Sequence, residues 1–361
     1  MTTRERMMCC YRNEPADTHT TAIYTRYLKR GEMERLVRSG GMGIIDYTAL
    51  TTQIGPPWHL IPEFISQVRD TDISIEYFWQ YGRRIQRRKY VTPVGTVYAD
   101  VGQDLGDGSE HISHYYIQSA EDYRTMKYIV DNTVIKSNEA LCRARRDDLG
   151  EDGVVIGRVD RTPYQKLLLE LVGGEQFLMD LYDDPEPVEE LMDALYRRLD
   201  EQMKMAMDSE VQVIWMAENV THDMTPPSAF RQYHLAAYKR YARWAHEAGK
   251  TIIAHFDGKV KALKDMLLES GLDGLESLSN PSIGGDSNYE ELCEMFPKLA
   301  LLPNFPANLA LETQDKIDEY ISDLKRTAEA HGRTLMLQVS EDLPPNAYRQ
   351  CLPRIVNAIN G

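Results

Sequence analysis

The feature that most constrains the fold of this chain is a repeated alternation of short apolar segments and amphipathic segments from about residue 150 onward. Each apolar segment has the length of a strand and precedes a loop and a helical pattern. Strands that are apolar along their whole length, next to amphipathic helices, are typical of a parallel sheet covered by helices. The predicted strands are VVIGRV (154–159), VQVIWMA (211–217), TIIA (251–254), LDGLE (272–276), LALLPN (299–304) and TLMLQV (334–339).

Two architectures contain such a parallel sheet, and the loop after the first strand distinguishes them. A dinucleotide-binding fold needs a glycine-rich phosphate loop after that strand, and this sequence has none. We therefore predict an α/β protein, a (β/α)₈ TIM barrel with an N-terminal helical and β-hairpin elaboration. It forms a single domain over 1–361, in which 1–150 supply the elaboration and the first barrel elements and 151–361 supply the main βα repeats.

The N-terminal part is less regular. A helical period extends over 18–40 and ends at Gly40-Gly41, and 43–50 read as a short strand. The segment 87–101 alternates β-forming residues about Pro93-Val94-Gly95, which predicts a hairpin.

Composition excludes several classes of function. The chain of 361 residues carries a net charge of −15, which argues against a nucleic-acid partner. Its one basic run, RRIQRRK (83–89), is interpreted as a solvated, partner-facing or anion-holding patch. No 18 apolar residues run together and the first residues lack a signal-peptide core, so we expect a cytoplasmic protein without a membrane partner. Five cysteines without paired spacing predict free thiols, and ligands other than sulfur for any metal.

Polar side chains follow the predicted strands, at the end of a barrel where catalytic groups lie. Each alone has an ordinary explanation, as a helix cap or a hydrogen-bonded core residue. Together, several carboxylates at one mouth would raise each other's pKa unless a cation held them. A divalent metal bound by one imidazole and oxygen ligands is the simplest interpretation. The groups are Asp160, Glu218, His255, Glu276, Asn304 and Glu341.

Four segments resemble the uroporphyrinogen decarboxylase-like superfamily and, within it, the zinc-dependent methyltransferases that work with corrinoid proteins. They are GGEQFLMDLYDDPEPVEELMDAL, TPPSAFRQYHLAAYKRYARWAHEAGKTIIAHFDG, ESGLDGLESLS and TLMLQVSEDLPPNAYRQCLPRIVNAI. The resemblance covers most of the chain, is best from about 150 to the end, and implies the same barrel.

The resemblance also implies a ligand set. Zinc in those methyltransferases is held by a His-x-Cys pair and a distant Cys, where this chain has His255-Phe256-Asp257 and Glu341-Asp342-Leu343-Pro344. Glu276 falls where the related cobalamin-independent methionine synthases have a glutamate ligand. The metal ligands implied are His255, Glu276, Glu341 and Glu218, so that oxygen replaces sulfur.

Further roles follow for other residues. Asp257 and Glu218 are the expected catalytic groups, and Asp257 is expected to orient the imidazole or a bound water. The residues expected to bind substrate are Asp160, Asn304 and Trp58.

The implied activity is transfer of a methyl group from an oxygen donor to the Co(I) of a corrinoid carried by a partner protein. Carboxylate ligands leave Zn²⁺ a harder Lewis acid, which suits polarisation of an ether oxygen. An aryl methyl ether is the preferred donor, a small methylated substrate and a corrinoid protein are the expected partners, and a homodimer is left open.

Three alternatives remain. A metal-free decarboxylase of the superfamily would need an N-terminal tryptophan, paired arginines and an aspartate, of which only the Pro57-Trp58 pair is an echo, because Arg83-Arg84 stand in the wrong kind of context. A glycosidase would use two carboxylates of the barrel mouth but leaves His255 unexplained. A non-catalytic ligand-binding barrel would be expected to lose some of the strand-end groups.

Overall fold

The structure, a computed structural model, describes residues 1–55, 67–103, 110–344 and 346–361. Trp58 therefore lies outside the described residues. Two compact units share the chain. We call Met1–Thr48, Glu139–Arg158 and Met207–Gly361 the barrel unit, and Ala49–Asn138 with Val159–Ala206 the insert unit. The single domain expected over 1–361 stays a prediction.

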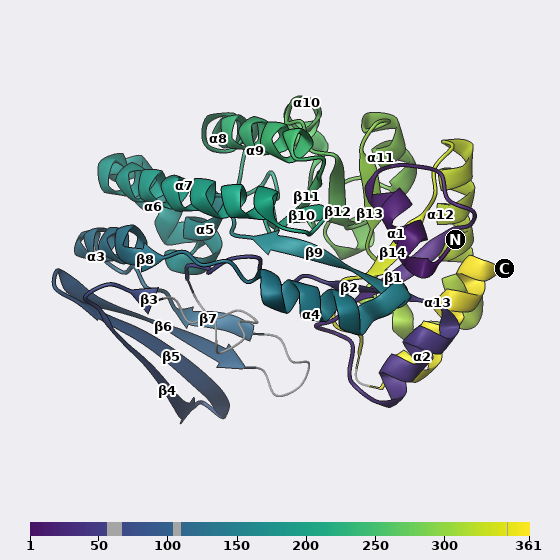
Figure 1. Cartoon of the computed structure of the whole chain (residues 1–361), viewed down its shortest axis with the longest axis horizontal. Coiled ribbons are helices and arrows are strands. Elements are labelled where there is room, and N and C mark those ends of the chain that lie inside the picture. The colour runs from purple at the N-terminus through teal and green to yellow at the C-terminus, as the bar shows by residue number, and fades with distance from the viewer. Residues whose placement is uncertain (56–66, 104–109, 345) are drawn as a thin grey trace. The chain divides into compact units, whose positions relative to one another are not determined.

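Eight parallel strands form the barrel unit and confirm the predicted fold class (Figure 1). They pair in chain order, and a parallel bridge between Asn304 and Gln338 joins the last strand to its predecessor. Every residue of these strands is buried, which explains why their sequences are largely apolar. The strands are β1 (Thr20–Tyr24), β2 (Gly43–Asp46), β9 (Gly153–Val159), β10 (Val213–Met216), β11 (Thr251–His255), β12 (Gly274–Leu278), β13 (Ala300–Pro303) and β14 (Met336–Val339).

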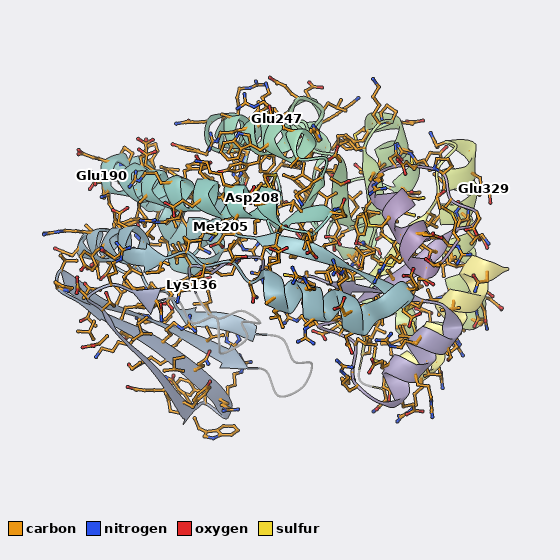
Figure 2. The ribbon with its side chains drawn as sticks, viewed as in Figure 1. Lys136, Glu190, Met205, Asp208, Glu247 and Glu329 are labelled. Atoms are coloured by element: carbon orange, nitrogen blue, oxygen red, sulfur yellow. The ribbon has the colours of Figure 1, made fainter. Side chains whose placement is uncertain are left out.

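Helices cover the outside of these strands. Their outer faces are charged, as Glu247 and Glu329 show by their exposed positions (Figure 2). The helices of the barrel unit are α1 (Thr3–Tyr11), α2 (Glu32–Gly40), α4 (Glu139–Leu149), α8 (Pro227–Tyr233), α9 (Leu235–Glu247), α10 (Lys264–Glu269), α11 (Tyr289–Met295), α12 (Gln314–Ala330) and α13 (Tyr348–Asn360). Shorter turns are η2 (Gly150–Asp152), η4 (Lys261–Leu263), η5 (Pro281–Ile283) and η6 (Ala307–Leu311).

The helix predicted over 18–40 is wrong in its first part. Residues Thr20–Tyr24 form the buried strand β1, which pairs with β2 on one side and β14 on the other. Their side chains, two threonines and an isoleucine among five, suit a pleated buried surface better than a helix. Helix begins only at Glu32.

The insert unit contains the predicted hairpin. Strands β5 (Arg83–Thr92) and β6 (Gly95–Gln103) pair antiparallel and end at Thr92 opposite Gly95. Strands β4 (Asp72–Gln80) and β7 (Glu110–His114) complete a sheet in the order β4-β5-β6-β7, and β3 (Gln67–Val68) pairs with β8 (Thr133–Val134). The helices are α3 (Ala120–Asn132), α5 (Pro163–Lys166), the π-helical turn η3 (Leu167–Leu171), α6 (Gly174–Asp183) and α7 (Pro185–Asp208), of which Met207 and Asp208 are counted in the barrel unit.

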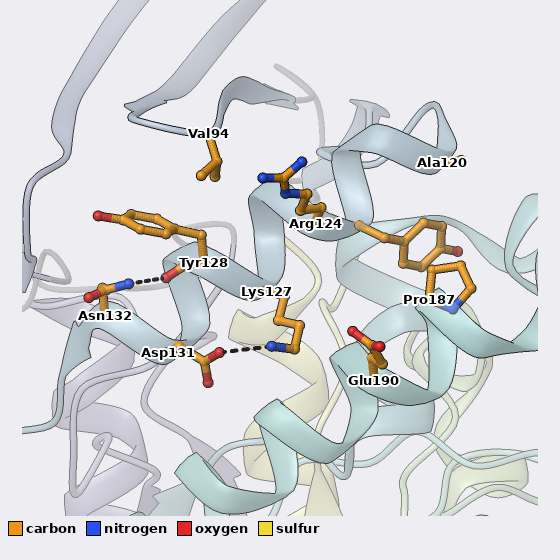
Figure 3. Close-up of a pocket in the computed structure, with 10 residues that line it drawn as sticks. Val94, Ala120, Arg124, Lys127, Tyr128, Asp131, Asn132, Pro187 and Glu190 are labelled. Atoms are coloured by element: carbon orange, nitrogen blue, oxygen red, sulfur yellow. Dashed lines mark hydrogen bonds and ion pairs between the residues drawn. The ribbon is translucent and has the colours of Figure 1, made fainter.

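A groove of about 410 Å³ in this unit is lined by side chains of α3 and α7 (Figure 3). Two of the charges in its wall form an ion pair, with Lys127 Nζ 3.2 Å from Asp131 Oδ2. We assign it no role.

Helix α1 closes the N-terminal end of the barrel. Arg4 donates a hydrogen bond to the carbonyl of Gly153 at the start of β9, and Asn13 donates one to Lys298 just before β13. Met7 and Tyr11, both without solvent exposure, reach the core that the strands enclose. Gly43 has no side chain because a Cβ there would overlap Met7 Sδ.

We predict that Met7→Ala lowers the free energy of unfolding by about 2–5 kcal/mol, because it removes a fully buried side chain and leaves a cavity. The matched change Met179→Ala, at a side chain 51% exposed on α6, should change it by less than about 0.5 kcal/mol. Urea unfolding of both variants gives the comparison. Equal effects would show that α1 is not part of the barrel core.

Candidate active site

The site is organised around His255, the last residue of β11. His255 is paired in register with Glu276 of the neighbouring parallel strand β12, so their side chains project from the same face of the sheet. His255 Nδ1 lies 2.7 Å from Glu276 Oε2. The imidazole is buried, at 8% exposure, and the carboxylate is fully buried.

Glu276 is held by three donors from three other strands. Trp215 Nε1 of β10 donates to Oε2 over 3.0 Å, the Tyr24 hydroxyl of β1 donates to Oε1, and His255 supplies the third contact. Both carboxylate oxygens are thus engaged. The carboxylate therefore fixes the orientation of the imidazole, as carboxylates that accept a hydrogen bond from a histidine ring do in many functional sites.

The other ring nitrogen faces a second carboxylate. His255 Nε2 lies 3.6 Å from Asp257 Oδ2, and Asn219 Nδ2 donates a 2.6 Å hydrogen bond to the same oxygen. The backbone N–H of Asn219 also donates to the His255 carbonyl over 3.0 Å. The loop after β10 therefore positions the loop after β11.

These contacts shift the pKa values of the site. Burial alone disfavours a charged imidazole, but the adjacent Glu276 and Asp257 outweigh it and raise the pKa of His255 to about 10. Burial opposes ionisation of Asp257 too, yet the contact with His255 and the hydrogen bond from Asn219 lower its pKa. For Glu341, burial and then the charge of Asp257 raise the pKa, against hydrogen bonds at Ala307 and Asn304. Glu341 thus belongs to the same electrostatic cluster.

A bulge shapes the adjoining strand ends. The register of β12 against β13 shifts between Glu276 and Leu278, and Ser277 between them has a φ of 60°, which is strained for a residue with a side chain. Ser277 Oγ lies 2.7 Å from Ser340 Oγ, and Ser340 Oγ in turn donates to Asn304 Oδ1 over 2.7 Å. This hydroxyl–amide chain links the ends of β12, β13 and β14.

An aromatic wall borders the imidazole. The ring centroids of Tyr24 and Tyr47 are 5.0 Å apart, and those of Tyr47 and Trp215 are 5.4 Å apart. Trp215 meets His255 edge to face at 5.6 Å. None of Tyr24, Tyr47, Trp215 and Asn219 is among the site residues predicted from the sequence. Trp215 and Tyr47 lie within the predicted strands 211–217 and 43–50, but nothing in those segments indicates that their side chains reach the site.

The predicted site residues that the structure describes fall into three groups. The structure brings His255, Asp257, Glu276, Glu341 and Asn304 together at the carboxyl ends of neighbouring strands of the barrel unit. Glu218 follows β10 and is fully buried, and its predicted roles stay predictions.

Asp160 belongs to the insert unit. Lys166 Nζ lies 2.5 Å from its Oδ1, and the Ile54 N–H donates to its Oδ2 over 3.0 Å. Its role in substrate binding, like that of Asn304, stays a prediction.

The predicted ligands do not form a ready metal cage. Among the described residues, no three imidazole, thiol or carboxylate side chains gather closely enough to hold an ion as they stand. Two of the donors nevertheless suit one ion. The 3.6 Å between His255 Nε2 and Asp257 Oδ2 is close to the separation of two ligands that each lie about 2.0–2.2 Å from one tetrahedral zinc.

The fold and this cluster define the protein as a (β/α)₈ barrel with a histidine–carboxylate site at the carboxyl ends of its strands. The sequence matches the family model of uroporphyrinogen decarboxylase (URO-D) over residues 104–361, and the chain belongs to this family. That finding confirms the resemblance seen in the sequence.

Solved structures give the fold further support. A methyltransferase from Methanosarcina mazei is similar with a TM-score of 0.58 and 14% identity, covering 100% of this chain and 98% of its own. Two further solved structures match, but their TM-scores are too low to support a conclusion. One is a chitinase from Chromobacterium violaceum, with a TM-score of 0.41, 10% identity, and coverage of 95% of this chain and 98% of its own. The other is a ribulose-1,5-bisphosphate carboxylase/oxygenase from Pyrococcus horikoshii, with a TM-score of 0.39, 10% identity, and coverage of 96% of this chain and 59% of its own. Curated protein sequences give no match. No helix within the described ranges is long and apolar enough to cross a membrane.

We predict that Glu276→Gln lowers the pKa of His255 from about 10 toward its ordinary value, because the carboxylate that favours the imidazolium becomes a neutral amide. A raised pKa means that protonation of His255 stabilises the fold at pH values below its ordinary pKa, and that this contribution is lost as the pH rises through about 10. NMR titration of the imidazole in metal-free protein measures the shift.

The control for this titration is Glu269→Gln, at an exposed carboxylate on α10. It should leave the His255 titration unchanged. An unchanged midpoint in Glu276→Gln would contradict the proposed pairing.

Proposed function

We propose that this protein is a zinc-dependent methyltransferase that moves a methyl group from an aryl methyl ether to the Co(I) of a separate corrinoid protein. Membership of the URO-D family supports an enzyme, and the barrel shared with a methyltransferase supports this class over the full length of the chain. The observation that carries the proposal is the orientation of His255. Glu276 engages Nδ1 and leaves Nε2 directed at Asp257.

The ligand set that fits best differs from the one inferred from the sequence. His255 Nε2, Asp257 and Glu341 would hold the ion, because Nε2 lies beside Asp257 and the pKa of Glu341 responds, after burial, to the charge of Asp257. Glu276 would support the imidazole from behind, since its oxygens already accept three hydrogen bonds. A bound zinc ion would supply Lewis acidity toward an ether oxygen.

The residues of the chain have their own tasks in such a reaction. The aromatic wall of Tyr24, Tyr47 and Trp215 offers faces and edges against which an aryl ring can pack beside the imidazole. Packing there would hold the methyl carbon in a fixed direction for attack, which is the main requirement of a displacement at carbon. Burial of the His255–Glu276 pair keeps that side of the site free of bulk water.

The proposed reaction is a nucleophilic displacement at the methyl carbon. The methyl carbon–oxygen bond breaks with its electron pair on oxygen, a cobalt–carbon bond forms from the Co(I) electron pair, and the phenoxide takes a proton from solvent. The corrinoid acceptor rests on the family resemblance alone.

We expect methyl-Co(III) to appear in the absorbance spectrum when the protein is mixed with a Co(I) corrinoid and methoxylated aromatic compounds. Methylamines should give no product, because nitrogen is a poorer match to an oxygen-ligated ion. Methanol tests whether the aryl group is needed. Decarboxylation of a porphyrinogen without any corrinoid, or turnover of methylamines alone, would overturn the proposal in favour of the decarboxylase or an amine-specific enzyme.

We also expect zinc-loaded protein to contain one zinc ion per chain and to lose it when His255 or Asp257 is changed to alanine. Glu276→Gln should keep the ion with an affinity lower by about 10–100-fold, the usual effect of losing the carboxylate that hydrogen-bonds a ligating histidine. Metal analysis after dialysis against graded chelator measures both effects. Full zinc stoichiometry in His255→Ala would disprove the ligand assignment.

A further inference from the structure

The four-stranded sheet of the insert unit has an unprotected edge. Within the described part of the chain, β4 is the outermost strand of this sheet and pairs with β5 alone (Figure 1). None of the nine residues of β4 is buried. Monomeric proteins usually protect such an edge with lysine, proline or a bulge. The sequence of β4 contains neither lysine nor proline, and its register against β5 is continuous.

Exposed aromatic side chains lie along this edge and in the turn that follows it. Tyr77 is 55% exposed, Trp79 66% and Tyr81 94%. Since an aromatic side chain has a surface of about 150–250 Å², these fractions leave roughly 400 Å² in contact with water. Apolar patches of about 300–600 Å² on a single chain often mark interaction surfaces.

The turn holds Tyr81 in a costly conformation. Gln80 pairs with Arg83 across a two-residue turn, in which φ is 50° at Tyr81 and 73° at Gly82. Asparagine or aspartate usually precedes the glycine of such a turn, because a bulky residue at positive φ is strained. The exposed side chain of Tyr81 gains too little packing against the described chain to offset this strain.

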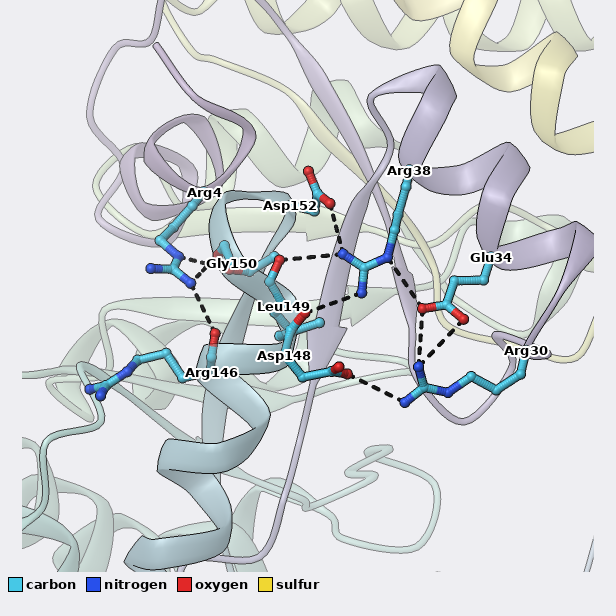
Figure 4. Close-up of polar contacts among 10 residues, drawn as sticks. Arg4, Arg30, Glu34, Arg38, Arg146, Asp148, Leu149, Gly150 and Asp152 are labelled. Carbon is cyan, nitrogen blue, oxygen red and sulfur yellow. Dashed lines mark hydrogen bonds and ion pairs between the residues drawn. The ribbon is translucent and has the colours of Figure 1, made fainter.

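The two ends of the hairpin formed by β4 and β5 carry opposite charges. Asp72 at the start of β4 and Arg83 at the start of β5 are both exposed, and neither forms an ion pair among the described residues. Arg83 Nη1 lies 3.1 Å from His111 Nε2. Arg38 on α2, by contrast, contacts two carboxylates (Figure 4). The hairpin thus has a carboxylate and a guanidinium group with which a second molecule can pair.

We propose that β4 pairs antiparallel with β4 of a second copy of this chain, across a twofold axis at Tyr77. Residues equally distant from Tyr77 in the two copies then face each other. Ile75 of one copy lies opposite Trp79 of the other, and Ile73 lies opposite Tyr81. Pairs of an aromatic and a β-branched side chain are among the favourable cross-strand pairs of antiparallel sheets.

The charges favour this register. An axis at Glu76 would place the Glu76 carboxylates of the two copies directly opposite each other, which is destabilising. The proposed axis instead places Glu76 opposite Phe78. It also brings Asp72 of one copy to the turn of the other, on the face from which Arg83 projects, because side chains alternate along a strand and Arg83 pairs with Gln80.

The surface available is large enough for a dimer. Two copies bring together roughly 800 Å² of aromatic surface, since each offers about 400 Å². The isoleucines and the backbone edges of both strands add to it, so the total approaches the roughly 1,200 Å² at which stable interfaces begin. Pairing also satisfies the outward N–H and C=O groups of both edge strands.

Sedimentation equilibrium of the full chain at micromolar concentration should give twice the mass of one chain. Trp79→Lys should raise the dimer dissociation constant about 100-fold or more, because it removes an aromatic contact twice and places a lysine on each edge. The fold should tolerate this change, since Trp79 is largely exposed. Tyr182→Lys, at a tyrosine 88% exposed on α6 of the same unit, is the matched control and should leave the dimer intact.

Two charge reversals test the register. Asp72→Arg and Arg83→Asp each place like charges together at both ends of the interface, so either alone should weaken the dimer several-fold. Mixed in equal amounts, the two variants should form a heterodimer that is more stable than either homodimer, because each arginine then meets an aspartate.

Three results would overturn the proposal. The first is a monomer at high micromolar concentration, which would leave β4 to a different partner. The second is a dimer that Trp79→Lys weakens no more than Tyr182→Lys does. The third is a mixture of Asp72→Arg and Arg83→Asp that associates no better than each variant alone.

Discussion

The structure of the barrel mouth depends on a single buried carboxylate. Glu276 has no solvent exposure, and an isolated charge in such a place costs several kcal/mol. Donors from β1, β10 and β11 offset that cost, because hydrogen bonds to a charged group contribute about 1.5–3 kcal/mol each. Four of the eight strands therefore meet at one side chain, and this contact sets both the closure of that part of the barrel and the direction in which His255 points.

The opposite end of the barrel is closed by different means. Helix α1 inserts Met7 and Tyr11 among apolar residues of the strands, and the phenol of Tyr11 is close enough to Glu276 for the carboxylate, after burial, to raise its pKa. The two ends thus have contrasting chemistry. The carboxyl ends of the strands gather charged groups about a histidine, whereas the amino ends are closed by apolar side chains of α1 and of the strands.

Much of this arrangement was predictable from local sequence. Segments that are apolar along their length indicated a parallel sheet. Because His255 and Glu276 stand at the ends of two such segments, both were expected at one edge of that sheet. The prediction failed at Thr20–Tyr24, where a helical period in the surrounding residues masked a strand. It failed there because pairing with β2 and β14, which lie distant in the chain, outweighs local propensity.

The sequence by itself determined the fold class, the family and the ends of the strands from which functional groups project. Which atoms of those groups meet was decided only by the tertiary structure. The bulge at Ser277 and the hydrogen bonds from Tyr24 and Trp215 turn Glu276 toward His255 Nδ1 and leave Nε2 to Asp257. Such a choice depends on side chains from five strands and loops packed against one another, and no pattern within a single segment contains it, because contacts between distant segments are fixed by the closure of the barrel.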